Sequence, residues 1–213
     1  MLIKNIKHDS HILTPQKARI IARLMADDCL YKFKSNYTLK YEVSNEELLK
    51  QFEQDVLYVY GLRTKRYLNE SGKKKGKLIP FVLVRSIKAY NDLLRYSSSY
   101  FSDKWIVPKE IFESSLEVKR EFLRAFFDDE GSIVKLKGRP CYVILYSINL
   151  KGIGQISLLL KDFGINSRIK NGYGLGRNVF GLIVKDVKLF ADSIGFYSKI
   201  KRNKLEHIFN NNL

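Results

Sequence analysis

Apolar and polar positions in the first half of the chain switch repeatedly between helical and strand-like spacing. A helix is predicted to begin near Thr14 and Pro15, because the apolar residues that follow recur at helical spacing, at Ala18, Ile21, Ala22 and Met25. Residues 30–43 and 63–85 are predicted as hairpins, and residues 45–60 and 87–96 as helices. This half is therefore predicted as helix, two strands, helix, two strands, helix.

The second half repeats this order after a stretch with little periodicity, residues 97–108, which we interpret as a connector. A helix from about Ser115 is followed by predicted hairpins and helices in the same alternation, and a final helix is predicted near residues 199–210. We expect an N-terminal half at residues 1–96, a connector at 97–114 and a C-terminal half at 115–213.

Each half begins with an apolar helical run that leads into acids: IARLMADDC at residues 21–29 and LRAFFDDEG at residues 123–131. Asp28 and Glu130 are 102 residues apart, close to half of the 213-residue chain, which indicates an internal duplication. If the two runs pack around a pseudo-twofold axis, both acids reach one end of the shared interface. Neighbouring carboxylates repel unless cations lie between them, so this end is a candidate divalent-metal site.

Both runs resemble the LAGLIDADG motif of homing endonucleases, and the second is the better copy. Ala125 stands where a small residue permits close helix packing, and Gly131 follows the acid where a left-handed helix end is expected. Residues 145–169 and 180–205 also resemble segments that follow the second motif in this family. The departures are Arg23 for a usual glycine, Cys29 for the terminal glycine, and a second acid beside each predicted ligand.

The resemblance implies an α+β fold: a tandem pseudo-twofold αββαββα repeat with two packed motif helices and two antiparallel sheets that form a DNA-binding saddle. It also implies a monomeric, intron-encoded homing endonuclease that makes a metal-dependent staggered double-strand break. Mg²⁺, with Mn²⁺ as a possible substitute, would be held by Asp28 and Glu130, with Asp27 and Asp129 as additional ligands through their main-chain carbonyls. The resemblance further assigns supporting catalytic roles, basic for Lys201 and Lys104 and polar for Asn45 and Asn149.

A formal net charge of +16 and a sequence pI of about 9.7 favour a polyanionic partner, which is either nucleic acid or an anionic membrane surface. No apolar run approaches the roughly 18 residues of a membrane span. The N-terminus lacks a signal-peptide core, so we expect a cytoplasmic protein.

Basic residues alternate with apolar ones in several predicted strands, for example Lys32 and Lys34 with Tyr31 and Phe33. Such alternation places the charges on one face of a sheet, and two sheets side by side would offer a concave basic surface to double-stranded DNA. A charged outer face is also ordinary for an antiparallel sheet. With the hairpin tips included, the candidate DNA-contacting residues are Lys32, Lys34, Lys40, Arg66, Lys74, Lys135, Lys137, Arg139, Arg168, Lys170 and Arg177.

Other functions remain open at this point. The same scaffold serves some relatives as an RNA maturase that assists intron splicing, and a non-catalytic DNA-binding regulator is a further alternative, because Arg23 and Cys29 could distort the first motif. An intein is disfavoured by the lack of flanking splicing sequences. The acids could also be ordinary helix-end residues, although acids at a helix C-terminus oppose the helix dipole.

Overall fold

The computed structural model describes residues 12–27, 30–70, 76–138, 140–174 and 178–210. The first half contains α1 (Pro15–Asp27), β1 (Leu30–Phe33), β2 (Asn36–Glu42), α2 (Glu46–Tyr60), β3 (Lys65–Glu70), β4 (Leu78–Arg85) and α3 (Ile87–Leu94). A short helix that the sequence did not predict, α4 (Lys109–Phe112), lies in the connector. The second half contains α5 (Leu116–Glu130), β5 (Gly131–Val134), β6 (Tyr142–Ser147), α6 (Leu150–Lys161), β7 (Ser167–Tyr173), β8 (Val179–Val184), α7 (Val187–Ser193) and α8 (Lys199–Asn210).

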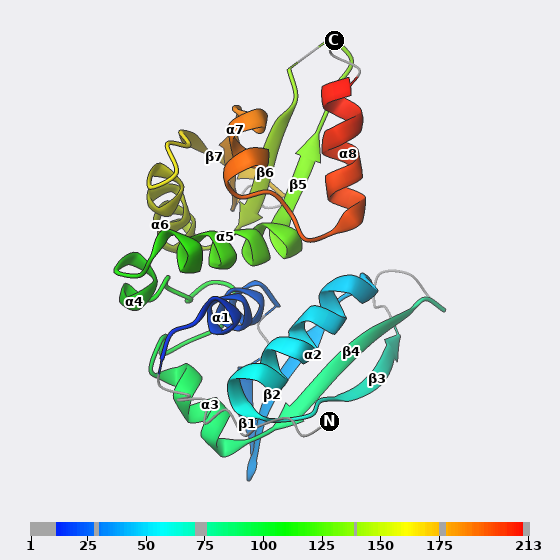
Figure 1. The fold of residues 1–213 in the computed structure, drawn as a ribbon, viewed down its shortest axis with the longest axis vertical. Coiled ribbons are helices and arrows are strands. Elements are labelled where there is room, and N and C mark those ends of the chain that lie inside the picture. Colours follow the sequence, from blue (N-terminus) through cyan, green and yellow to red (C-terminus); the bar gives the residue numbers. More distant parts are fainter. Residues whose placement is uncertain (1–11, 28–29, 71–75, 139, 175–177, 211–213) are drawn as a thin grey trace, which may run out of the picture.

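The two halves have the same topology. The strands form two four-stranded antiparallel sheets in the orders β1-β2-β4-β3 and β5-β6-β8-β7, so each half repeats the other's strand order. Each half is an αββαββα unit, and α4 and α8 are additions to it. The predicted α+β fold with a pseudo-twofold repeat is confirmed (Figure 1).

Helix starts follow local sequence chemistry. Polar side chains accept a hydrogen bond from a backbone N–H of the first turn and so satisfy a group that has no partner within the helix. The residues that do this are Asn45 for α2, Ser86 for α3, Ser115 for α5, Asn149 for α6 and Asp186 for α7. These caps explain why the helix boundaries were predictable to within a few residues.

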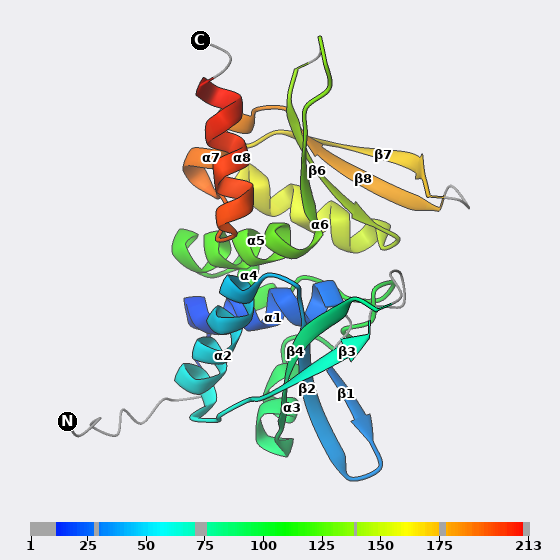
Figure 2. The ribbon, with the colours of Figure 1, turned by 90° about the vertical axis from the view of Figure 1, so that its right-hand side faces the viewer.

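Each sheet has a face that packs against helices and a face that is open. In the first sheet, Leu39, Tyr41 and Val82 are fully buried on the packed face, and in the second sheet Val143 and Leu182 are. The helices α2, α7 and α8 lie on one side of the molecule, and the strands fan out toward the other side (Figure 2). The open faces of both sheets therefore belong to one side of the protein.

The motif helices α1 and α5 lie side by side between the two halves (Figure 1 and Figure 2). Ala22 and Ala125 are both fully buried on them. Two ion pairs cross this interface, from Arg19 to Glu121 at 2.6 Å and from Arg23 to Asp129 at 3.1 Å. Both pairs advance in the same chain direction, so the helices run in parallel and end at the same side of the interface.

The end of α5 differs from the prediction. Gly131 was expected in the left-handed conformation, but it has φ −83° and ψ 145°, which is extended backbone. A β-carbon at this position would lie 2.5 Å from the carbonyl oxygen of Phe127. Close approach to the preceding helical turn, and not a left-handed backbone, is therefore what requires glycine here.

Candidate functional site

The last turn of α5 carries three consecutive acids, Asp128, Asp129 and Glu130, whose side chains point in different directions. Successive helical residues are turned by about 100°, so neighbours in sequence face different surroundings. Asp128 accepts hydrogen bonds from the backbone N–H groups of Tyr197 at 2.8 Å and Ser198 at 3.1 Å. Burial raises the pKa of Asp128 to about 6, partly offset by Arg23 and these two bonds.

Asp129 is buried in the interface with the N-terminal half. It accepts hydrogen bonds from Arg23 at 3.1 and 3.3 Å and from the Tyr41 hydroxyl at 2.7 Å. Burial raises the pKa of this carboxyl, while Arg23 and Tyr41 act in the opposite direction. The Arg23 side chain is itself fully buried and also donates to Gln51. The carboxylate of Asp129 therefore holds α5 against α1 and β2.

Glu130, the last of the three acids, lines a cavity. The cavity has a volume of about 310 Å³, and its walls come from α1, the connector, α5 and the second sheet. The residues around Glu130 include Met25, Ala26, Ser102, Trp105, Phe126 and Tyr146. Because Ala26 belongs to the last turn of α1, the cavity lies where both motif helices end.

The repeat itself indicates which N-terminal acid corresponds to Glu130. Asp27 is the last described residue of α1, and it lies 103 positions before Glu130, which ends α5. Leu30 and Ile133, which point into the cores of their sheets, are also 103 positions apart. A spacing of 102, as predicted from Asp28, would align core-facing Leu30 with the exposed Ser132. Asp28 and Cys29 lie outside the described residues, as does the side chain of Asp27.

Lys201, predicted as a basic catalytic residue, lies in the first turn of α8 against the end of α5. Its ammonium group donates to three carbonyl oxygens, those of Phe127 at 3.0 Å, Asp128 at 2.5 Å and Gly131 at 2.6 Å. Burial lowers the pKa of Lys201, although Asp128, Asp129 and Glu130 all favour its charged form. Its three donors are directed at backbone and not at the cavity. Its expected counterpart, Lys104, is exposed in the connector.

Asn45 and Asn149, predicted as polar catalytic residues, are helix caps at equivalent places in the two halves. The Asn45 side chain accepts from the N–H of Glu47 and donates to the Ser198 hydroxyl at 3.0 Å. The Asn149 side chain accepts from the N–H of Gly152 and donates to the carbonyl of Trp105 at 2.6 Å. Both ends of each amide are used in structural contacts, so the structure gives these residues a capping role.

The open face of the second sheet carries the basic residues that were predicted there. Arg168 pairs across the sheet with Ile183, and Lys170 with Gly181, and both basic side chains are exposed. Lys135 and Lys137 are also exposed but follow the end of β5, so they belong to a loop and not to a strand. Lys74, Arg139 and Arg177 lie outside the described residues.

In the first sheet, several basic residues do not lie on the open face, where they were predicted. Arg66 pairs across the sheet with the buried Val82, so it faces the helix side and binds Glu53 and Glu46 of α2. Lys32 shares the face of Leu30 and lies over the Tyr37 ring. Lys34 is in the turn, with φ 53°. Of the predicted set in this sheet, Lys40 is on the open face, where its ammonium binds Glu42 at 2.7 Å.

Two basic residues on the open face of the first sheet were not predicted. Lys65 is opposite Leu83, in the same row as Lys40, and Arg85 is opposite Thr38. Both side chains are exposed. The signal was available in the sequence, because Val82 and Val84 fix the packed face of β4 and therefore place Arg85 on the other face.

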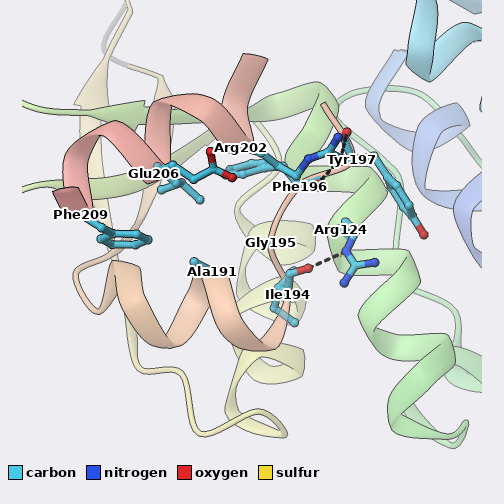
Figure 3. Close-up of a pocket in the computed structure, with 10 residues that line it drawn as sticks. Arg124, Ala191, Ile194, Gly195, Phe196, Tyr197, Arg202, Glu206 and Phe209 are labelled. Carbon is cyan, nitrogen blue, oxygen red and sulfur yellow. Dashed lines mark hydrogen bonds between the residues drawn. The ribbon is translucent and has the colours of Figure 1, made fainter. Parts of the chain in front are cut away.

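A second cavity, of about 410 Å³, lies between α5, α7 and α8 (Figure 3). Two guanidinium groups at its wall are bound to backbone, Arg124 to the carbonyl of Ile194 at 2.6 Å and Arg202 to the carbonyl of Tyr197. The groups that line it do not include an acid from the ends of the motif helices. We therefore regard this cavity as part of the packing of α8 against α5 and α7.

The comparisons with known proteins agree with this fold. A family model described as LAGLIDADG-like domain matches residues 117–195. The structure of I-DmoI in complex with DNA and Mn is 18% identical with a TM-score of 0.64, and the match covers 86% of this chain and 98% of that one. The homing endonuclease I-WcaI bound to its DNA recognition sequence is 15% identical with a TM-score of 0.64, and 94% of both chains is covered. Residues 117–195 therefore match a LAGLIDADG-like domain, and the chain as a whole has the fold of these two structures.

Among curated proteins, a glutamine–fructose-6-phosphate aminotransferase of Methanocaldococcus jannaschii is 28% identical over 206 residues, which cover 92% of this chain. The chain spans 18% of that protein and 18–22% of two tRNA-splicing ligases RtcB from Pyrococcus species. The likeness is thus to a segment within proteins of unrelated named chemistry, and it supports neither named activity. In the described part of the chain, no helix is long and apolar enough to cross a bilayer.

Proposed function

We propose that this chain is a metal-dependent DNA endonuclease that cuts both strands of a long duplex target. The observation that carries the proposal is the position of Glu130, which lines a cavity where α1 and α5 both end. Glu130 lies in the wall of this cavity, so its carboxylate is the one that we assign to a ligand there.

A divalent ion fits this donor set with help from the DNA. The described residues contain no group of three acids, histidines or cysteines that could hold a metal. Mg²⁺ is often bound by one or two carboxylates together with substrate phosphates and water, so Glu130 and Asp27 would suffice. Asp28 remains the adjacent candidate. When bound, such an ion supplies an activated water and neutralises charge at the scissile phosphate. I-DmoI structures contain Mn, Mg or Ca, which supports a metal of this class.

The surface that would receive the DNA is the pair of open sheet faces. Arg168 and Lys170 on the second sheet and Lys65 and Arg85 on the first are exposed cations on these faces. A net charge of +16 adds long-range attraction for a polyanion. Because I-DmoI and I-WcaI are homing endonucleases bound to DNA, we further propose that the target is specific and that the gene lies in an intron.

The proposal is tested by selecting cleaved sequences from a randomised duplex library with Mg²⁺ and then assaying a selected target. Glu130→Gln should abolish cutting while DNA binding in Ca²⁺ is retained, because the substitution removes a charge but keeps the shape. Glu117→Gln, at an exposed position in the first turn of α5, is the matched control and should cut normally. Cutting by Glu130→Gln at the normal rate would show that Glu130 is not a metal ligand.

If the wild-type chain binds but enriches no cleaved duplex, the nuclease proposal is wrong. Two other functions would then be compared in the same preparation. Selective binding of a structured intron RNA would indicate a maturase, and selective binding of duplex DNA without cutting would indicate a regulator.

A further inference from the structure

The junction between α5 and α8 joins the end of one helix to the start of another through reciprocal caps. The carboxylate of Asp128, near the C-terminus of α5, accepts the backbone N–H groups of Tyr197 and Ser198 just before α8 begins. In return, Lys201 in the first turn of α8 donates to three carbonyls around the end of α5. An anion lies at a helix N-terminus and a cation at a helix C-terminus, which are the favourable arrangements for both dipoles.

The carbonyls that Lys201 binds lie on both sides of Glu130. Those of Phe127 and Asp128 precede it, and that of Gly131 follows it. Lys204, one helical turn later, donates to the carbonyl of Ile133 at 2.8 Å. Two lysines of α8 therefore fix the backbone of the segment that carries the acid, and neither is among the residues that line the cavity.

The N-terminal motif has a different residue at the corresponding place. Met25 is 103 positions before Asp128 and is fully buried, so it has no charge with which to cap a neighbouring helix. Lys104, the expected counterpart of Lys201, is exposed in the connector, whereas Lys201 is half-buried. The two halves share a topology, but they anchor the ends of their motif helices by different contacts.

We propose that α8 positions Glu130 through the caps at its junction with α5. A mutation that removes these caps should then slow the cleavage of one DNA strand more than that of the other. This inference rests on the proposed nuclease function. Lys201 acts through the backbone that carries Glu130 and does not itself touch the reacting phosphate. Loosening this segment displaces Glu130 and leaves the end of α1 in place, so the strand whose scissile phosphate meets Glu130 should be cut more slowly than the other.

The test uses the full chain and a selected duplex target with a different label on each strand. Lys201→Met removes the donors and keeps most of the aliphatic stem. Lys199→Met, at an exposed site of the same helix, is the matched control. Lys201→Met should slow the nicking of one strand by about tenfold or more, because small misplacements of catalytic groups carry penalties of this order, and should change the other strand less than about twofold. Asp128→Asn removes the opposite half of the junction and should slow the same strand.

A second measurement needs neither DNA nor metal. Hydrogen exchange of the backbone amides at residues 131–134 should be faster in Lys201→Met than in the wild type and unchanged in Lys199→Met. Equal slowing of both strands, or unchanged exchange at these amides, would overturn the positioning role. If the wild-type chain does not cut, the proposed function fails, and the exchange measurement alone decides whether α8 fixes this segment.

Discussion

The buried ion pair between Arg23 and Asp129 gives the sharpest prediction about stability. The side chains are 0% and 4% exposed, and the closest nitrogen and oxygen are 3.1 Å apart. Replacing Asp129 with Leu leaves the guanidinium buried with Tyr41 and Gln51 as neutral partners. Coulomb's law at an effective dielectric constant of about 20 gives about 5 kcal/mol at this separation, and removing one partner of a buried pair typically costs about 3–5 kcal/mol.

We therefore expect Asp129→Leu to lower the free energy of unfolding by about 3–5 kcal/mol, as measured by urea denaturation. A chain of this length should lose roughly 2–4 °C of Tm for each kcal/mol. The control is Asp192→Leu, because Asp192 is paired with Lys188 at the same 3.1 Å but the side chains are 59% and 72% exposed. Its loss should be under about 1 kcal/mol.

The double variant Arg23→Met with Asp129→Leu tests the cause. Removing both charges leaves no uncompensated ion, so most of the lost stability should return, to within about 1 kcal/mol of the wild type. A double-mutant cycle should give a coupling free energy of about 2 kcal/mol or more. If Asp129→Leu costs no more than Asp192→Leu, or if the double variant is less stable than either single one, the reasoning about burial is refuted.

Three further predictions follow from named contacts. Arg66 lowers the pKa of Glu53, so the stability that this pair adds is present above about pH 4.3 and is lost as the pH falls. In Glu53→Gln the free energy of unfolding, measured by urea denaturation between pH 3 and 7, should therefore fall less steeply on the acid side. Arg168→Ala and Lys170→Ala should each weaken DNA binding in fluorescence titrations, and each should reduce the slope of log K against log salt concentration by about one. Arg66 faces α2, so Arg66→Ala should do neither. Gly131→Ala should cost about 1–3 kcal/mol by thermal unfolding, whereas Gly154→Ala in α6, with open space around it, should add up to about 1 kcal/mol; equal effects would contradict the close approach to Phe127.

The order of elements was predictable because the spacing of apolar residues changes at each boundary and polar caps mark the helix starts. The roles of Asp128, Asp129 and Glu130 were not predictable, because a helix turns about 100° at each residue and the sequence does not show which neighbour each side chain meets. The prediction of which sheet face each basic residue occupies was wrong in places for a related reason. An error of one residue in register moves a side chain to the opposite face, as happened for Lys32 and Arg66.

The distribution of charge between the motif helices also shows how the two halves have diverged. Arg19 and Arg23 lie on α1, and their partners Glu121 and Asp129 lie on α5. Two copies of α1 paired in the same way would place guanidinium groups near each other in a buried interface, and two copies of α5 would do the same with carboxylates. Such like-charge contacts cost several kcal/mol when desolvated and so act against the wrong pairing. The interface therefore favours the pairing of one half with the other within a single chain, and it does so through residues one or two turns from the site.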